Sequence, residues 1–260
     1  MSKWNYEAEI KKMPKLRNPI LIEGLPGIGN IGKVAVDFII EEMKAKLLFT
    51  ITSYSLPHSV FVTEDNLVEL PKIEVYYKIR KDKKQDLIFL SGDIQPTDEE
   101  ASYEFAETIL QMLESFGGKE IITVGGIGLP SVPEDPDVYC TGTSKEMIAK
   151  YKKGTKLSDN MYGIVGPIVG VTGLLIGLGQ KHDMDGICIL AETYGHPLYL
   201  GMKGSQKVLA VLNKKLNLKL NLKSLGKEIQ EVEEEIMKRT EQLTKMKNLP
   251  KGISETTYIG

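Results

Sequence analysis

The stretch that decides the fold is "PILIEGLPGIGNIGKVAVDFIIEEM", residues 19–43. It begins with an apolar run typical of a buried strand, and it ends with apolar residues at helical spacing. A cluster of glycines around Pro26 separates the two runs. A strand, a glycine turn and a helix in this order indicate the first strand–helix unit of an α/β protein.

The glycines of this turn match two nucleotide-binding patterns. Gly27-x-Gly29-x-x-Gly32 fits the dinucleotide fingerprint, but the strand expected next offers no acidic residue at its end to hold a ribose. Gly27 to Gly32 followed by Lys33 fits a phosphate loop up to its last position. That position should carry a hydroxyl for Mg²⁺, and Val34 has none. The first pattern therefore lacks its ribose-binding acid, and the second lacks its Mg²⁺-binding hydroxyl.

Two interpretations of the turn stay open. In the first, Gly27, Gly29, Gly32 and Lys33 hold an anion at a helix N-terminus, which predicts a nucleotide- or phosphate-binding enzyme or sensor built on Gly24–Lys33. In the second, Gly24 and Gly27 supply turn dihedrals, while Gly29 and Gly32 let the helix pack close to the sheet. The second interpretation is favoured because it requires no missing group.

The remaining reactive residue types form no recognisable site. His58, His182 and His196 are scattered along the chain without the paired spacing that a metal site needs. Cys140 and Cys188 lie in apolar or strand-like contexts, which predicts buried, reduced thiols. We therefore expect no catalysis, no cofactor and no metal.

Two carboxylates directly follow strand-like runs. Asp93 comes after "DLIFLSG", and Glu192 comes after "GICILA". Sites in α/β proteins often form at the carboxyl ends of strands. These two residues are candidates only if the chain binds a nucleotide.

Strand-like and helical runs alternate along most of the chain. The expected strands cover residues 19–24, 46–54, 72–80, 86–92, 119–126 and 185–193. The expected helices cover residues 30–43, 98–116, 167–180 and 205–217. Residues 130–160 are polar and proline-rich, which predicts a surface loop with one short helix. The pattern predicts an α/β domain over residues 1–216, with a mixed, mostly parallel sheet flanked by helices.

Composition and charge exclude several classes of partner. The net charge of the 260-residue chain is −2, and only Arg17, Arg80 and Arg239 among its 33 basic residues are arginine. The chain has neither a net positive potential nor a cluster of arginine guanidinium groups, so no nucleic-acid partner is expected. No apolar run is long enough to span a bilayer, so we expect no membrane and a cytoplasmic location.

A heptad pattern follows the predicted domain, over residues 217–248. Its apolar positions alternate at steps of three and four residues, which favours a helix that pairs with another helix. This could join protomers in a homo-oligomer or fold back on its own domain. We call these apolar heptad positions the seam; they are Leu222, Leu225, Ile229, Val232, Ile236, Leu243 and Met246.

The last residues, 249–260, are expected to form a flexible tail. Pro250, Gly252 and small polar residues precede Tyr258, Ile259 and Gly260. An aromatic residue near the end of a flexible segment can dock with the terminal carboxylate in a pocket of a partner. Tyr258, Ile259 and Gly260 are therefore the predicted partner-binding residues.

Several glycine-bearing blocks together resemble one known family. The stretch "GLPGIGNIGKVAVDFI" resembles the start of the proteasome assembly chaperone 2 family, whose archaeal members include the Pba chaperones. Three further blocks fit the family in order and spacing, so that the likeness covers about residues 16–215. These are "LSGDIQPTDEEASYEFAETILQML", "TVGGIGLP" and "YGIVGPIVGVTGLLIGLGQKHDMDGICILAET".

The resemblance implies an α/β domain similar to nucleoside phosphorylases and a homo-oligomer without catalytic activity. It also implies binding to the α subunits of the 20S proteasome core particle. Some archaeal members dock a C-terminal tail whose tyrosine is penultimate, whereas Tyr258 stands one place earlier. The alternative remains an enzyme or sensor that is ATP-grasp-like or nucleoside phosphorylase-like and uses Gly24–Lys33.

Overall fold

Residues 19–43 fold into the predicted strand, turn and helix. Strand β2 (Ile20–Glu23) is buried along its whole length. The short 3-10 helix η1 (Ile28–Asn30) leads from the glycine turn into helix α1 (Ile31–Glu42). The computed structural model describes residues 4–63, 65–82, 84–163, 166–196 and 199–222. These residues fall within one compact unit that extends to Leu222.

The central sheet is mixed. In the described part of the chain its eight strands follow the order β1-β3-β6-β7-β2-β8-β10-β9. The four neighbours β7, β2, β8 and β10 run parallel, while every other pairing is antiparallel. The other strands are β1 (Asn5–Ala8), β3 (Lys46–Thr52), β6 (Ile73–Lys78), β7 (Leu87–Gly92), β8 (Glu120–Leu129), β9 (Val138–Gly142) and β10 (Asp185–Tyr194).

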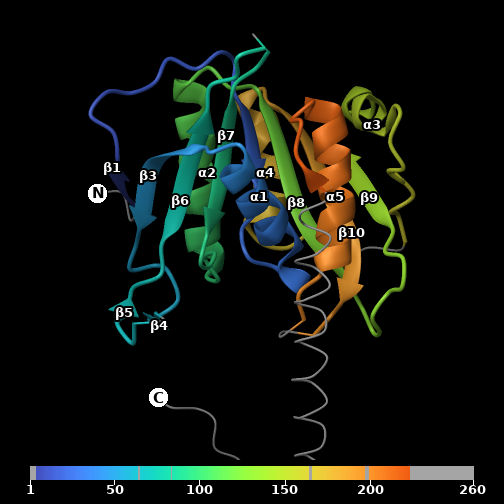
Figure 1. Cartoon of the computed structure of the whole chain (residues 1–260), viewed down its shortest axis with the longest axis horizontal. Coiled ribbons are helices and arrows are strands. Elements are labelled where there is room, and N and C mark those ends of the chain that lie inside the picture. The colour runs from blue at the N-terminus through green and yellow to red at the C-terminus, as the bar shows by residue number, and fades with distance from the viewer. Residues whose placement is uncertain (1–3, 64, 83, 164–165, 197–198, 223–260) are drawn as a thin grey trace, which may run out of the picture. The chain divides into compact units, whose positions relative to one another are not determined.

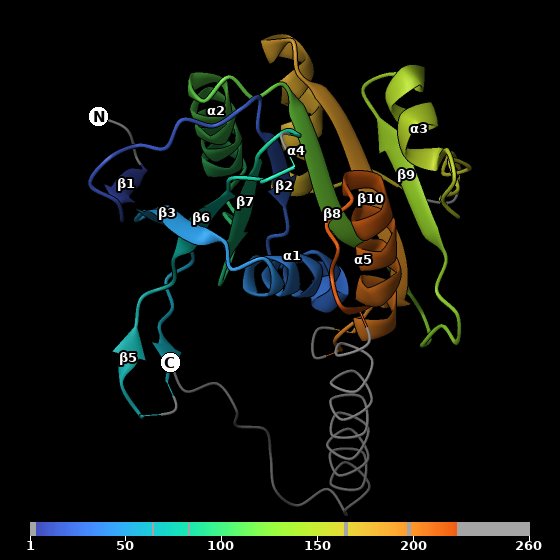
Figure 2. The same cartoon turned by 45° about the horizontal axis from the view of Figure 1, so that its top comes forward.

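Helices cover both faces of this sheet and complete three layers. Helices α1 and α5 (Met202–Leu216) lie on one face, and α2 (Glu99–Ser115) and α4 (Val171–Gly179) lie on the other, as Figures 1 and 2 show. Leu21 of β2, Phe105 of α2 and Leu175 of α4 belong to one fully buried cluster. The predicted mixed α/β architecture is thus confirmed, with parallel pairing confined to the central strands.

Helix α1 crosses the sheet at a very short distance because two glycines face each other. A Cβ on Gly32 would lie 2.4 Å from the carbonyl oxygen of Val124 on β8. A Cβ on Gly24 would lie 2.3 Å from the carbonyl oxygen of Gly32. Real Cβ atoms do not approach backbone oxygens so closely, so both positions require glycine. The predicted close packing is confirmed at Gly32, and it extends to Gly24.

The sequence-based boundaries need two corrections. The sequence predicts a helix over residues 98–116, but α2 covers Glu99–Ser115, because Asp98 is its N-cap and accepts a hydrogen bond from the N–H of Ala101 at 2.9 Å. The predicted loop at 130–160 contains strand β9 as well as helix α3 (Lys145–Lys152). Strand β9 was missed because only its pairing with β10 makes it a strand.

A two-stranded hairpin forms a separate small sheet. Its strands are β4 (Phe61–Val62) and β5 (Val68–Glu69), which pair antiparallel. Both strands are exposed, and Figures 1 and 2 show the hairpin at one end of the molecule, away from the helices. We call Val60–Val62 with Leu67–Leu70 the apolar hairpin.

A buried aspartate ties the start of β7 to two arginines. The carboxylate of Asp86 accepts the N–H of Arg17 at 2.8 Å, the Arg17 guanidinium at 2.9 Å and the N–H of Arg80 at 2.7 Å. Burial by itself would raise the pKa of Asp86. The hydrogen bonds from Arg17 and Arg80 outweigh it and hold that pKa below its ordinary value.

No helix among the described residues combines the length and the apolar character that crossing a membrane requires.

Candidate functional site

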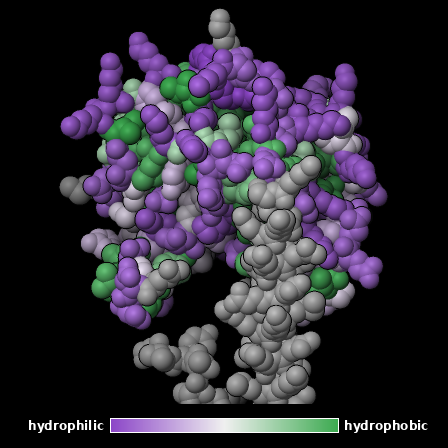
Figure 3. All heavy atoms as spheres, viewed as in Figure 1, coloured by the Kyte–Doolittle hydropathy of each residue, from purple (hydrophilic) through white to green (hydrophobic). Residues whose placement is uncertain are grey.

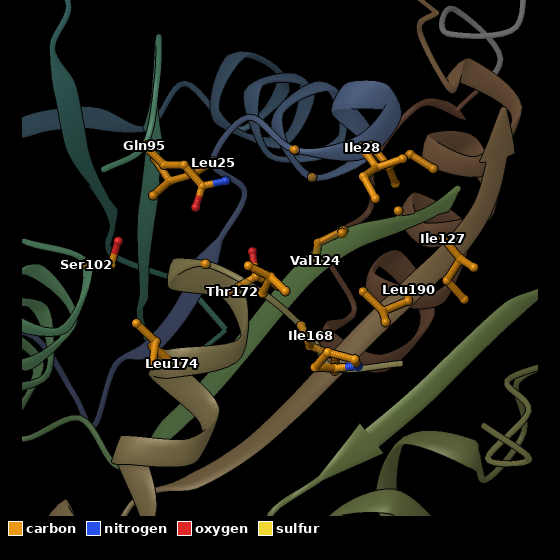
Figure 4. Close-up of a pocket in the computed structure, with 18 of the residues that line it drawn as sticks. Leu25, Ile28, Gln95, Ser102, Val124, Ile127, Ile168, Thr172, Leu174 and Leu190 are labelled. Carbon is orange, nitrogen blue, oxygen red and sulfur yellow. The ribbon is translucent and has the colours of Figure 1, made fainter. Parts of the chain in front are cut away.

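A cavity of about 950 Å³ opens at the carboxyl ends of the central parallel strands. Its walls come from the glycine turn after β2, the loop after β7, the second half of β8, and the segment that leads into α4. Figure 4 shows Val124 of β8, Thr172 of α4 and Leu190 of β10 around the same space. The volume lies in the range of small-molecule sites.

The cavity occupies the point of the sheet where such sites are expected. After β2 the chain turns to α1 on one face, and after the adjacent β7 it turns to α2 on the other face. A crevice forms between neighbouring strands whose connections leave in opposite directions. Gln95 bridges this crevice. Its amide donates to the carbonyl of Pro26 at 2.6 Å, and its oxygen accepts the N–H of Val171 at 3.2 Å.

The described residues that line the cavity are mainly glycines and aliphatic side chains. Glu99 is the one charged residue among them, and no lysine or arginine is present. The neutral polar side chains are Gln95, Thr97, Ser102 and Thr172, together with the hydroxyl of Tyr103. The aliphatic lining comprises Leu25, Ile28, Ile31, Val124, Ile127, Ile168, Val169, Leu174 and Leu190. Such walls suit a ligand with little charge.

A buried carboxyl group lies directly behind this lining. Glu23 ends β2 and is fully buried; its Oε1 accepts the N–H of Leu25 at 2.9 Å and the hydroxyl of Thr172 at 3.3 Å. Its Oε2 has no hydrogen-bond partner of good geometry among the described residues. Burial raises the pKa of Glu23 to about 7, and bonds from Leu25, Thr172 and the backbone of Val124 only partly offset it. Folding therefore favours the protonated form of Glu23.

The wild type is expected to lose stability between pH 5 and pH 8 because buried Glu23 gives up its proton. Glu23→Gln is expected to abolish this loss. The folded protein holds the proton of Glu23 up to a pKa of about 7, whereas an unfolded chain releases it near 4.3. The free energy of unfolding therefore falls as pH rises between these values, by roughly 2 kcal/mol from this group.

Urea unfolding of both proteins at pH 5 and pH 8 measures this effect. All other groups titrate in both proteins, so the difference between the two proteins isolates Glu23. Equal pH dependence in the wild type and the variant would show that Glu23 is not buried as a neutral acid.

The four residues of the predicted anion site do not converge. Gly27 and Gly32 line the cavity, while Gly29 and Lys33 do not. Gly29 has φ +63°, and a Cβ there would lie 2.5 Å from the hydroxyl of Thr193. Lys33 forms an ion pair with Asp37 at 2.8 Å, one turn along α1. The cavity thus offers an anion no cationic side chain, and the nucleotide alternative stays a prediction.

The other candidate carboxylates hold backbone in place. Asp93 accepts the N–H of Lys72 at 3.2 Å, and Glu192 accepts the N–H of Asp137 at 2.9 Å. Neither lines the cavity.

Two of the histidines and both cysteines serve packing and local contacts, while His58 is exposed. His182 contacts Glu107 at 2.7 Å, and His196 stacks on Tyr194. Both cysteines are buried, as expected. Within the described ranges no three potential metal ligands come together.

The predicted helical seam and tail fall almost wholly beyond the described residues. Of the seam, the structure describes Leu222 alone, so the assignment of residues 217–248 to a paired helix remains a prediction. Leu225, Ile229, Val232, Ile236, Leu243, Met246 and the tail residues Tyr258, Ile259 and Gly260 lie outside the described ranges.

Sequence reasoning missed the polar residues around the cavity. Gln95 follows β7 and Thr172 lies in the first turn of α4; both fall within the blocks that resemble the family, but no ligand-binding motif singles them out. Glu23 carried a signal, because it is the one acid in the otherwise apolar run "PILIEG". An acid at the end of a fully buried strand is rare enough to mark a site.

The layers and the cavity define a three-layer α/β protein with a crevice at the carboxyl ends of its parallel strands. The family model described as the PAC2 family matches residues 21–240, so the chain belongs to the PAC2 family. The resemblance found in the sequence is confirmed.

Relatives and solved structures agree with this assignment. An uncharacterized protein of Methanocaldococcus jannaschii is 31% identical over 258 residues, which cover 97% of this chain and 96% of that protein. The crystal structure of Pyrococcus furiosus PbaB, described as an archaeal proteasome activator, superposes with a TM-score of 0.83 at 35% identity. The superposition covers 93% of this chain and 100% of the PbaB chain.

A second archaeal structure shares the fold. Pyrococcus furiosus PbaA, described as an archaeal homologue of proteasome-assembly chaperone, has a TM-score of 0.73 at 24% identity, over 94% of both chains.

Proposed function

We propose that this chain is a proteasome assembly chaperone-like protein that binds α subunits of the 20S core particle as a homo-oligomer. It acts by binding and carries out no reaction of its own. The observation that carries the proposal is membership of the PAC2 family together with the likeness to PbaB over nearly the whole chain.

The apolar hairpin supports a protein partner. Val62, Val68 and Leu70 are 69%, 69% and 73% exposed, and Figure 3 shows hydrophobic atoms gathered on this part of the surface. A two-stranded sheet with uncovered apolar side chains is marginally stable in water unless something packs on it. Residues 59–70 contain acidic but no basic residues. A partner surface with an apolar groove and a basic rim would complement it.

The predicted seam and tail complete the proposal. Pairing of the helices over residues 217–248 would join protomers and bring several tails together. Each tail would then present Tyr258, Ile259 and Gly260 to a pocket between α subunits, and several tails on one oligomer would bind more tightly than one.

A binding assay with recombinant archaeal α subunits tests the function. We expect the full chain to retain α subunits, and a chain without Tyr258–Gly260 to bind more weakly. Absence of binding by the full chain would reject the proposal. Light scattering of the chain with and without residues 217–260 tests the oligomer, because an unchanged mass would place the seam within one protomer.

Val62→Asp is expected to weaken α-subunit binding at least tenfold while leaving the melting temperature unchanged. The side chain is exposed, so a charge costs the folded chain little, but it must be desolvated when an apolar partner covers it. Val132→Asp is the matched control, because Val132 is also exposed and lies outside the hairpin. Equal binding by both variants would remove the hairpin from the contact surface.

A further inference from the structure

The glycines of the turn between β2 and α1 are needed for different physical reasons. Gly24, Gly29 and Gly32 are explained by backbone conformation or by contact with neighbouring atoms. Gly27 is not explained in this way. Its φ is −157°, an extended value that any residue adopts, and a Cβ built on it meets no atom within 4 Å. It lines the cavity.

From this we propose that the cavity binds a neutral, mainly apolar small organic molecule, and that Gly27 leaves space for it. The inference goes beyond the proposed binding of proteasome subunits and does not depend on it. Gly27 is exposed at the cavity lining and a Cβ there would meet only open space, so the fold itself would accept a larger side chain at this position.

The charge and polarity of the side chains that line the cavity determine which class of ligand it can bind. Side chains that hold phosphates carry positive charge, and the described lining residues offer none. Lys33, the cation nearest in sequence, is paired with Asp37. A phosphorylated ligand would therefore bind without a counter-charge. Aliphatic walls with a few neutral polar groups match a ligand that gains most of its binding energy from apolar burial.

Two further features point to an occupant. Ile28, Tyr103 and Val169 line the cavity and are 51%, 53% and 80% exposed, so a molecule seated there would cover large side chains that now face water. The carboxyl group of Glu23 lies behind Leu25 and Thr172 with Oε2 unpartnered among the described residues. A buried polar atom without a partner is uncommon in proteins, and a water held between the ligand and Glu23, which does not itself line the cavity, would satisfy it.

A neutral fluorescent probe, N-phenyl-1-naphthylamine, tests the proposal with the full chain. We expect its fluorescence to rise on binding, and we expect neither ATP nor orthophosphate to displace it. Gly27→Leu should bind the probe at least tenfold more weakly, because the new side chain occupies the mouth of the cavity.

Gly177→Leu is the matched control. Gly177 is exposed on α4, does not line the cavity, and a Cβ there also meets nothing within 4 Å. This variant should bind like the wild type, and circular dichroism and melting temperature verify that both variants fold.

Four results would overturn the proposal. They are no probe binding by the wild type, equal binding by Gly27→Leu and the wild type, displacement by ATP or phosphate, and displacement by α subunits. Displacement by ATP or phosphate would support the nucleotide alternative. Displacement by α subunits would assign the cavity to the protein interface. Failure of α-subunit binding in the separate assay leaves the probe result unaffected, so the two proposals fail independently.

Discussion

Gly32→Ala is expected to lower the free energy of unfolding by about 3 kcal/mol or more. The new Cβ would lie 2.4 Å from the carbonyl oxygen of Val124 and 3.2 Å from Cα of Gly24. Both contacts are with backbone, which cannot rotate away as a side chain can. Helix α1 must therefore move off β8 or the strands must separate.

Urea unfolding of Gly32→Ala and Gly177→Ala measures this cost. Both replace a helical glycine with alanine, but position 177 is open. The control is expected to gain about 0.5 to 1 kcal/mol from helix propensity and reduced freedom of the unfolded chain. A loss below 1 kcal/mol at position 32 would mean that α1 is not held so close to the sheet.

Asp86→Ala is expected to cost about 3 kcal/mol at pH 7. The substitution leaves the buried N–H of Arg80 without its acceptor and removes the charged partner of Arg17. Because folding holds the pKa of Asp86 low, its contribution is present above the unfolded pKa near 3.9 and is lost as pH falls through the folded value.

Unfolding at pH 7 and at pH 3 tests both parts of this expectation. The difference between the wild type and Asp86→Ala should shrink on acidification. Asp65→Ala serves as the control, since Asp65 is exposed and its loss should change stability by less than 0.5 kcal/mol. A pH-independent difference would show that packing, and not the charge of Asp86, holds β7 and Arg17 together.

Several elements could be predicted from the sequence because their own residues specify them. β2, β7 and β10 are apolar almost throughout, and α1 and α2 repeat apolar residues at helical spacing. The short strands β1, β4, β5 and β9 have no such pattern. β9 is a strand because it pairs with β10, about fifty residues later, and no local property encodes that contact.

The candidate site was less predictable for a related reason. The motif glycines were found, but the sequence alone did not show which of them serve packing and which lines the cavity. That distinction depends on Val124 and Thr193, residues on other strands. Glu23 and Thr172 meet across 149 positions of the chain. A polar pair that folding assembles over such a distance has no spacing to recognise.

The bridge made by Gln95 has a kinetic consequence. Its side chain bonds to Pro26 and to Val171, which are 69 and 76 positions away, so the segments around the cavity mouth are linked. No single segment can swing outward without breaking a buried or half-buried bond. Widening of the open mouth therefore requires these segments to move together or a bond of Gln95 to break, which is slower than the motion of an isolated loop. Gln95 thus fixes the width of the mouth, while the fit of the walls to the occupant sets how long a bound molecule stays.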